Sequence, residues 1–283
     1  MSDGIGRRNS SGLVRDIDLL DLLSGTESDQ TGGLGVTRLA QLTGRDKAII
    51  SRALGTLADA GLVDRDPVSL NYRLGGRLYA LAARTTEASM VARSRALLRR
   101  LAQTSRETTH LCVLRGGNVL TLLSELSPHE FRTTGWEGIT TAAWRTPSGR
   151  VLISDWDRAS LQHWYDQHGH DRGVVGPSAV AAGFAVLDAP LPGKAIVTDF
   201  DSLLTEIQRI RDRGYATLDE ELEAGVVGAS APVTDLSGRV IAAINVSAPK
   251  SRISGQLDKL GVFVARAAAE LSAQLGGVPR VES

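Results

Sequence analysis

The chain of 283 residues has a single cysteine, Cys112, and this scarcity limits the chemistry available to it. One cysteine excludes an intramolecular disulfide and any zinc site built on cysteine pairs. Cys112 lies between Leu111 and Val113 in an apolar, strand-like run. That setting favours a small buried core residue over a redox sensor.

Long apolar segments are missing as well. No uninterrupted apolar run approaches the length of a membrane-spanning helix. Residues 1–12 are polar and have no apolar core of the kind a signal peptide carries. We therefore expect a cytoplasmic protein that does not contact a membrane.

Neither sign of charge is in excess, since 32 Lys and Arg balance 32 Asp and Glu. Such a balance argues against a protein that coats nucleic acid or an anionic membrane. Residues 1–84 are also nearly neutral, with 11 Lys and Arg against 10 Asp and Glu. An apolar fraction of 42% is typical of a globular protein, and the length allows two domains.

A helix–turn–helix pattern is present between Val36 and Val63. Thr43-Gly44 separates two segments, and Asp46 is suited to cap the second helix, which ends near Gly61. Apolar residues recur at helical spacing in this second segment: Ile49, Ile50, Ala53, Leu54 and Leu57. A polar face remains outside, formed by Lys47, Ser51, Arg52 and Thr56. The pattern predicts a helix that enters the DNA major groove, although ordinary helical domains also produce it.

A short hairpin follows this helix. Leu62-Val63 and residues 71–74 have the character of strands, and residues 64–69 supply turn chemistry. A hairpin in this place is the wing of a winged helix. Arg65 and Arg73 are expected to approach the DNA phosphates from it.

The sequence places a domain boundary near Arg84 and Thr85, and from Thr108 onward its patterns alternate between strands and helices. We expect a disordered tail over residues 1–12, a winged helix–turn–helix domain over 13–84 and a second domain over 85–278. In the first domain, residues 13–23 should be helical and 24–35 a loop; residues 75–84 and 86–104 should be helical connectors. Strands are expected at 110–114, 119–126, 215–218, 225–233 and 239–247, and helices at 147–155, 160–167, 201–213 and 254–275. Long helices around an antiparallel sheet give an α+β fold.

The order of these parts resembles one bacterial family, the IclR-type transcriptional regulators, over about residues 13–276. The N-terminal marks are Lys47, Arg52, Leu54, Leu57, Ala60-Gly61 and Tyr72-Arg73-Leu74-Gly75. The C-terminal marks are Thr146-Pro147-Ser148-Gly149-Arg150, Arg213-Gly214-Tyr215-Ala216, Asp219-Glu220-Glu221, Gly225-Val226, Ala231-Pro232-Val233 and Val246-Ser247-Ala248-Pro249. Each block is weak alone, but their order and spacing together are specific.

The resemblance implies a regulator of transcription without catalysis and without a cofactor. Members form dimers through the DNA-binding end, and often tetramers; they act as repressors, activators or both, usually on catabolic operons. The C-terminal domain would be PAS/GAF-like, with a sheet flanked by helices and a pocket for a small organic-acid or aromatic effector. Two symmetric readers would bind a pseudo-palindromic operator in double-stranded DNA.

The pocket is where this chain departs from the family. The resemblance places the effector-binding residues at Ala143, Trp144, Leu218, Gly228, Asn245 and Ser247. Trp144 replaces a frequent His, Leu218 replaces an acid and Gly228 a frequent Cys, while Arg150 keeps the cation of a frequent Lys. These changes predict a roomier, less polar site, and we expect a larger or partly apolar effector held by Asn245 and Ser247.

The DNA-binding residues predicted are Arg45, Lys47, Ser51, Arg52, Thr56, Arg65 and Arg73. Arg52 has an alternative role, bracing the helix against its neighbour. The chain has one cluster with ligand-type side chains, His163, Asp166, His168, His170 and Asp171, and a surface loop explains it better than a metal site. The rival hypotheses are a small-molecule-processing enzyme with a winged-helix assembly domain, and a constitutive regulator without effector.

Overall fold

The computed structural model describes residues 12–129, 137–171, 174–175, 190–253 and 255–276. The chain divides into two compact units, the first extending to Ala88 and the second beginning at Ser89. Each unit has a core of its own. The predicted tail lies outside the described residues, except for Gly12, the first residue of helix α1.

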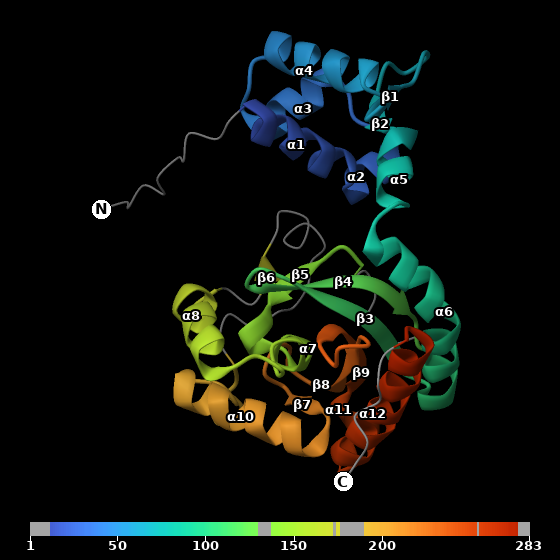
Figure 1. The fold of residues 1–283 in the computed structure, drawn as a ribbon. Coiled ribbons are helices and arrows are strands. Elements are labelled where there is room, and N and C mark those ends of the chain that lie inside the picture. The colour runs from blue at the N-terminus through green and yellow to red at the C-terminus, as the bar shows by residue number, and fades with distance from the viewer. Residues whose placement is uncertain (1–11, 130–136, 172–173, 176–189, 254, 277–283) are drawn as a thin grey trace. The chain divides into compact units, whose positions relative to one another are not determined.

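The first unit has five helices and one hairpin in its described part (Figure 1). They are α1 (Gly12–Leu23), α2 (Thr26–Thr31), α3 (Val36–Thr43), α4 (Lys47–Asp59), β1 (Val63–Arg65), β2 (Tyr72–Leu74) and α5 (Gly76–Ala82). Leu19, Leu39, Ile50 and Leu54 are fully buried where α1, α3 and α4 meet. The β1–β2 hairpin, with Val63 opposite Leu74, forms the wing.

Local chemistry fixes the ends of α4. The Asp46 carboxylate accepts a hydrogen bond from the Ala48 N–H at 2.7 Å, which caps the helix start. Gly44 and Gly61 take positive φ angles of 65° and 72° on either side of it, which glycine adopts without strain. These two turns set the direction of α4 against α3 and against the wing.

The second unit is built on a seven-stranded antiparallel sheet with the strand order β6-β5-β4-β3-β9-β8-β7. Its strands are β3 (Thr108–Arg115), β4 (Asn118–Glu125), β5 (Thr140–Ala142), β6 (Val174–Val175), β7 (Ala216–Asp219), β8 (Val226–Thr234) and β9 (Val240–Pro249). Its helices are α6 (Thr86–Ser105), the 3-10 turn η1 (Ala143–Arg145), α7 (Pro147–Leu152), α8 (Arg158–His168), α10 (Phe200–Arg213), α11 (Lys250–Ile253) and α12 (Leu257–Gln274).

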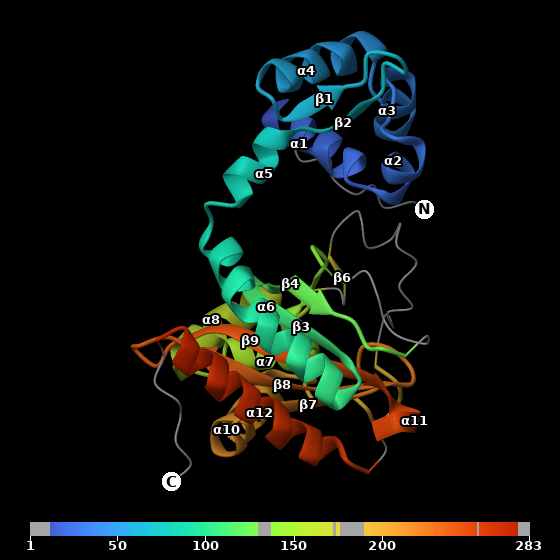
Figure 2. The same ribbon diagram turned by 90° about the vertical axis from the view of Figure 1, so that its right-hand side faces the viewer.

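The two faces of this sheet are covered differently. Helices α6 and α12 lie on one face, over side chains such as Leu111, Ile244 and Val246 (Figure 2). Helices α7, α8 and α10 belong to the core of the other face, with Cys112 and Ala243. Because side chains alternate along a strand, neighbouring residues of β3 and β9 belong to opposite cores. The predicted α+β class, with an N-terminal helix–turn–helix and a C-terminal antiparallel sheet flanked by helices, is confirmed.

Several expectations about local structure were wrong. The expected loop over residues 24–35 contains α2, which Gly32 ends at a positive φ of 68°. The helix expected over 147–155 ends at Leu152, and the short helix α11, which was not expected, precedes the last helix. The last helix itself, α12, agrees with the helix expected over 254–275. Strands β5 and β6 are too short for their periodicity to appear in the sequence. Within the described ranges, every helix is too short or too polar to cross a membrane.

We expect Gly149→Ala to destabilise the second unit, because an added Cβ would overlap the backbone of Ala143. Overpacking of this kind costs about 1–3 kcal/mol of unfolding free energy, measurable by urea denaturation. Gly55→Ala in α4 is the matched control, since its added Cβ has no atom within 4 Å apart from its chain neighbours and the backbone of its own helix. It should stabilise the first unit by up to about 1 kcal/mol, through helix propensity. Equal effects of the two substitutions would contradict the packing described for α7.

Candidate functional site

The first candidate surface is the polar face of α4. Lys47, Ser51, Arg52 and Thr56 are all exposed on this helix, while Ile50 and Leu54 are buried beneath it. Within the described part of the chain, the Lys47 and Arg52 side chains make no hydrogen bond or ion pair. Thr56 donates to the Arg52 carbonyl at 3.1 Å, a bond within the helix. The helix therefore presents two uncommitted cations and two hydroxyl groups.

The other three predicted cations are engaged inside the first unit. Arg45 donates to the Arg15 carbonyl at 2.8 Å and pairs with Asp16 at 3.4 Å, with its side chain 18% exposed. This contact fastens the start of α4 to α1. On the wing, the Arg65 guanidinium lies 5.3 Å from the Tyr72 ring centroid, and Arg73 is 4.0 Å from the Asp64 carboxylate.

Two apolar residues of α4 also face outward, and the sequence pattern missed them. Ile49, expected in the buried stripe, is 44% exposed, and Ala48 is exposed beside it. Ile50 and Leu54, four residues apart, define the buried side, and Ile49 is rotated away from it by about 100°. The Asp46 cap fixes where α4 begins, and the spacing from this start to Ile50 could have indicated which side of the helix is buried.

The second candidate site is a cavity on the sheet face that carries α7. It holds about 630 Å³ of space, solvent at the open mouth included. Strands β3, β4, β5, β7, β8 and β9, the start of α7 and the β7–β8 connection form its walls. The lining residues are His110, Cys112, Val119, Thr121, Thr141, Thr146, Pro147, Ser148, Leu218, Leu222, Glu223, Val226, Gly228, Asn245 and Ser247.

Polar groups gather on the sheet side of this cavity. The Asn245 amide donates to the Ser247 hydroxyl at 2.8 Å, while its Oδ1 is buried without a partner among the described residues. His110 Nδ1 lies 2.9 Å from the Ser124 hydroxyl. These residues share one side of the sheet, because β3 and β9 pair with His110 opposite Asn245.

Burial changes the pKa of three ionisable lining groups: His110, Cys112 and Glu223. It lowers the pKa of His110 to about 4, and it raises the pKa of the Cys112 thiol to about 11. Burial also raises the pKa of Glu223, on the β7–β8 connection. At neutral pH the histidine and the thiol therefore offer hydrogen bonds without charge.

The structure brings together four of the six residues predicted for effector binding: Leu218, Gly228, Asn245 and Ser247. Trp144 and Ala143 are not among the lining residues. The Trp144 indole donates to the Asp171 carbonyl at 3.1 Å, and the Ala143 N–H donates to the Gly117 carbonyl at 2.9 Å. These partners are distant in sequence, so spacing could not reveal them. His110, Thr121 and Glu223 were missed, although the alternation His110, Cys112 along one strand was a usable signal.

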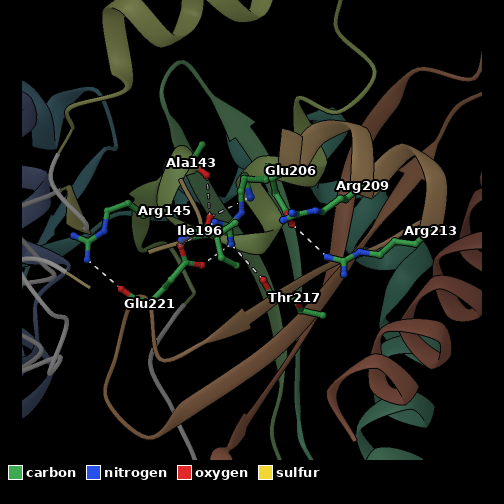
Figure 3. A network of polar contacts seen from close by, with 11 residues as sticks. Ala143, Arg145, Ile196, Glu206, Arg209, Arg213, Thr217 and Glu221 are labelled. Carbon is green, nitrogen blue, oxygen red and sulfur yellow. Dashed lines mark hydrogen bonds and ion pairs between the residues drawn. The ribbon is translucent and has the colours of Figure 1, made fainter. Parts of the chain in front are cut away.

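A buried ion pair fixes the wall of the cavity. The Arg150 guanidinium in α7 binds both carboxylate oxygens of Glu221, at 3.1 and 2.8 Å, and the two side chains are 0% and 3% exposed. Arg150 also donates to the Thr217 carbonyl, and Glu221 accepts from the Ile196 N–H (Figure 3). Arg150 is therefore committed to this network. Glu221 precedes the lining residues Leu222 and Glu223, so the pair ties α7 to the cavity wall.

The histidine-rich segment is engaged in local contacts. His168 pairs with Asp171 at 3.0 Å, His163 lies 3.0 Å from the Gln167 amide, and His170 stacks near Tyr165. Among the residues that the structure describes, no three His, Cys, Asp or Glu side chains converge on a point that would hold a metal ion.

Comparisons with known proteins match both units. Residues 12–67 match the IclR helix-turn-helix domain, and residues 192–273 match the family model described as bacterial transcriptional regulator IclR C-terminal. The HTH-type transcriptional regulator BhcR of Paracoccus denitrificans is 30% identical over 99% of this chain and 93% of its own length.

Solved structures agree in fold. An IclR transcriptional regulator from Alicyclobacillus acidocaldarius has a TM-score of 0.70 at 23% identity, covering 95% of this chain and 100% of the other. An IclR homologue from Microbacterium hydrocarbonoxydans, solved with 4-hydroxybenzoate, has a TM-score of 0.73 at 19% identity, covering 94% and 99%.

We expect Arg150→Met to lower the unfolding free energy of the second unit by about 3–5 kcal/mol, since Glu221 would stay buried without its cation. Adding Glu221→Gln should recover part of the loss, because the uncompensated charge is removed. Arg209→Met is the control, as its guanidinium is 62% exposed beside Glu206 and should cost less than about 1 kcal/mol. Denaturant unfolding of the four proteins measures these differences; equal losses for Arg150→Met and Arg209→Met would refute the role assigned to the buried pair.

Proposed function

The chain belongs to the IclR family of bacterial transcriptional regulators, and we propose that it controls a catabolic operon by binding DNA through α4 and an effector in the second-unit cavity. It is a DNA-binding regulator with an effector-binding C-terminal domain. The observation that carries the proposal is the pairing of two features. One unit exposes uncommitted cations on α4, and the other has a cavity with a buried, unpartnered polar atom.

For DNA, we propose that α4 enters the major groove. Lys47, Ser51 and Arg52 would contact bases and phosphates near the helix start, with Thr56 along the same face. Arg65 and Arg73 would contact phosphate from the wing once their weak internal contacts are released. Arg45 is assigned a positioning role, since it holds the start of α4 on α1 through Asp16.

We propose that two copies bind a pseudo-palindromic operator as a homodimer, with a tetramer as a pair of such dimers. Support comes from apolar side chains exposed on two helices of the first unit. Leu13, Val14 and Ile17 are 46–70% exposed on α1, and Tyr79 and Leu81 are 80% and 55% exposed on α5. Large apolar side chains left exposed on neighbouring turns of a helix, as on α1, are typical of an interface.

For the effector, we propose a small organic-acid or aromatic compound, with the aromatic class favoured. Val119, Pro147, Leu218, Leu222 and Val226 give the cavity apolar walls, and Asn245 and Ser247 give it a polar end. The Microbacterium relative, solved with 4-hydroxybenzoate, supports this class. Effector binding would shift the population of dimer geometries that match the half-site spacing.

A regulator without catalysis fits the cavity better than an enzyme does. The Cys112 thiol, with its pKa of about 11, is protonated at neutral pH and a poor nucleophile. Ser148 accepts a hydrogen bond from Ser230 at 3.2 Å, a neutral hydroxyl that cannot act as a strong base. Neither side chain has the activation that nucleophilic catalysis requires.

We expect Lys47→Ala and Arg52→Ala each to weaken operator binding by about 1–3 kcal/mol, since each removes a contact to a base or phosphate. The measurement is fluorescence anisotropy with a duplex selected by the full-length protein from a random library. Lys259→Ala and Arg266→Ala, exposed on α12, are matched controls and should leave affinity unchanged. Unchanged affinity in both α4 variants would rule out this docking.

We expect single-ring aromatic compounds to bind the cavity more tightly than short keto acids such as pyruvate and glyoxylate. A ring bound against the apolar walls removes apolar surface from water, whereas a two- or three-carbon acid leaves those walls in contact with water. Isothermal titration with full-length protein measures both classes. Asn245→Ala should weaken every compound that binds in the cavity. Tight binding of keto acids without binding of aromatic compounds would reverse the assignment.

A further inference from the structure

The charge that a ligand meets in the cavity is set by Glu223. This carboxylate lines the cavity on the β7–β8 connection, and its side chain makes no hydrogen bond or ion pair within the described residues. Arg150, close by in α7, is bound to Glu221 through both terminal nitrogens and does not line the cavity. No cation among the described lining residues offsets the charge of Glu223, and burial raises the pKa of its carboxyl. Above that pKa, a ligand in the cavity meets a negative charge without a compensating cation.

The buried polar atoms of the cavity also favour a ligand that carries no negative charge. Asn245 is 9% exposed, and one of its two amide N–H groups donates to the Ser247 hydroxyl. Its Oδ1 is left as a buried acceptor without a donor. An unsatisfied buried acceptor is costly, and a ligand that brings an O–H or N–H satisfies it. A carboxylate would place a second acceptor against it.

The remaining polar groups add hydrogen bonds without charge. Burial keeps His110 neutral, and its Nδ1 is paired with the Ser124 hydroxyl, so Nε2 is the ring nitrogen left for a ligand. Thr121 and Thr141 add hydroxyl groups on the β4–β5 side. Such groups bind a ligand hydroxyl as donors or acceptors, but they do little to offset a full negative charge buried beside Glu223.

We propose that this cavity selects an uncharged, hydroxyl-bearing effector and disfavours the corresponding carboxylate. The ligand hydroxyl donates to Asn245 Oδ1, and the apolar part of the ligand lies against Leu218 and Val226. Glu223 acts as the specificity-determining residue, because its charge repels an anion. This inference rests on the proposed role of the cavity as the effector site, and it narrows the two proposed effector classes to aromatic compounds without a carboxylate.

Matched pairs of alcohol and acid test the proposal. Full-length protein is titrated calorimetrically at pH 7.5 with 4-hydroxybenzyl alcohol against 4-hydroxybenzoate, and with benzyl alcohol against benzoate. Each pair differs in the charged group and little else. We expect each alcohol to bind at least about tenfold more tightly than its acid, a difference of about 1.4 kcal/mol. An acid that equals or exceeds its alcohol, or a pair in which neither compound binds, overturns the proposal.

Three variants assign the effect to residues. Glu223→Gln should reduce the difference in affinity between alcohol and acid, mainly through tighter binding of the acid. Asn245→Ala should lower the affinity for the alcohol about tenfold or more. Asp212→Asn, on the exposed side of α10, removes a carboxylate away from the cavity and should leave both affinities unchanged. If the difference in affinity between alcohol and acid is unchanged in Glu223→Gln, the role assigned to Glu223 is contradicted.

The outcomes separate this inference from the proposed function. An acid that binds better than its alcohol, and loses affinity in Asn245→Ala, refutes the charge preference but keeps the cavity as the effector site. Binding that is indifferent to Asn245→Ala for every compound refutes both.

Discussion

The Arg150–Glu221 ion pair is the interaction on which the effector-binding unit depends. Burying two charges is costly, and their attraction offsets the cost only when the geometry holds both groups firmly. Here the guanidinium spans both carboxylate oxygens, and Glu221 also accepts from the Ile196 N–H. One pair thus joins α7, the β7–β8 connection and the segment before α10. That junction positions the cavity wall. Because Arg150 is bound to Glu221, it does not bind the ligand.

The alternation of side chains along β3 and β9 explains how one sheet supports both a packed core and a binding site. Leu111, Ile244 and Val246 point toward α6 and α12 and form an apolar layer. The cavity on the opposite side of the sheet is lined by the residues adjacent to these in sequence, His110, Asn245 and Ser247. The antiparallel register then sets His110 opposite Asn245. The polar end of the cavity is therefore a direct consequence of strand pairing, while α7 and the β7–β8 connection close it.

Features with a local cause were predictable from the sequence. The Asp46 cap, the Gly44 and Gly61 turns and the period of Ile50 and Leu54 place α4 and its exposed cations. Asn245 and Ser247 were assigned by the family resemblance, and their alternation on one strand places them on the same face. Features with distant partners were not predictable. Arg45 is held by Asp16, about thirty residues away, and Trp144 turns to Asp171; Glu223 reaches the cavity only because β7 and β8 pair. The proposed ligand class depends on Glu223, which is why the family resemblance alone could not specify it.

We expect occupancy of the cavity to be coupled to DNA binding, and coupling between two sites is reciprocal. The direct test measures DNA affinity with and without saturating 4-hydroxybenzyl alcohol, and ligand affinity with and without saturating selected duplex, on the same full-length protein. We expect both affinities to change by the same factor, roughly 5- to 150-fold, and the change to disappear in Asn245→Ala. A ligand that fills the cavity and leaves DNA affinity unchanged would contradict this expectation.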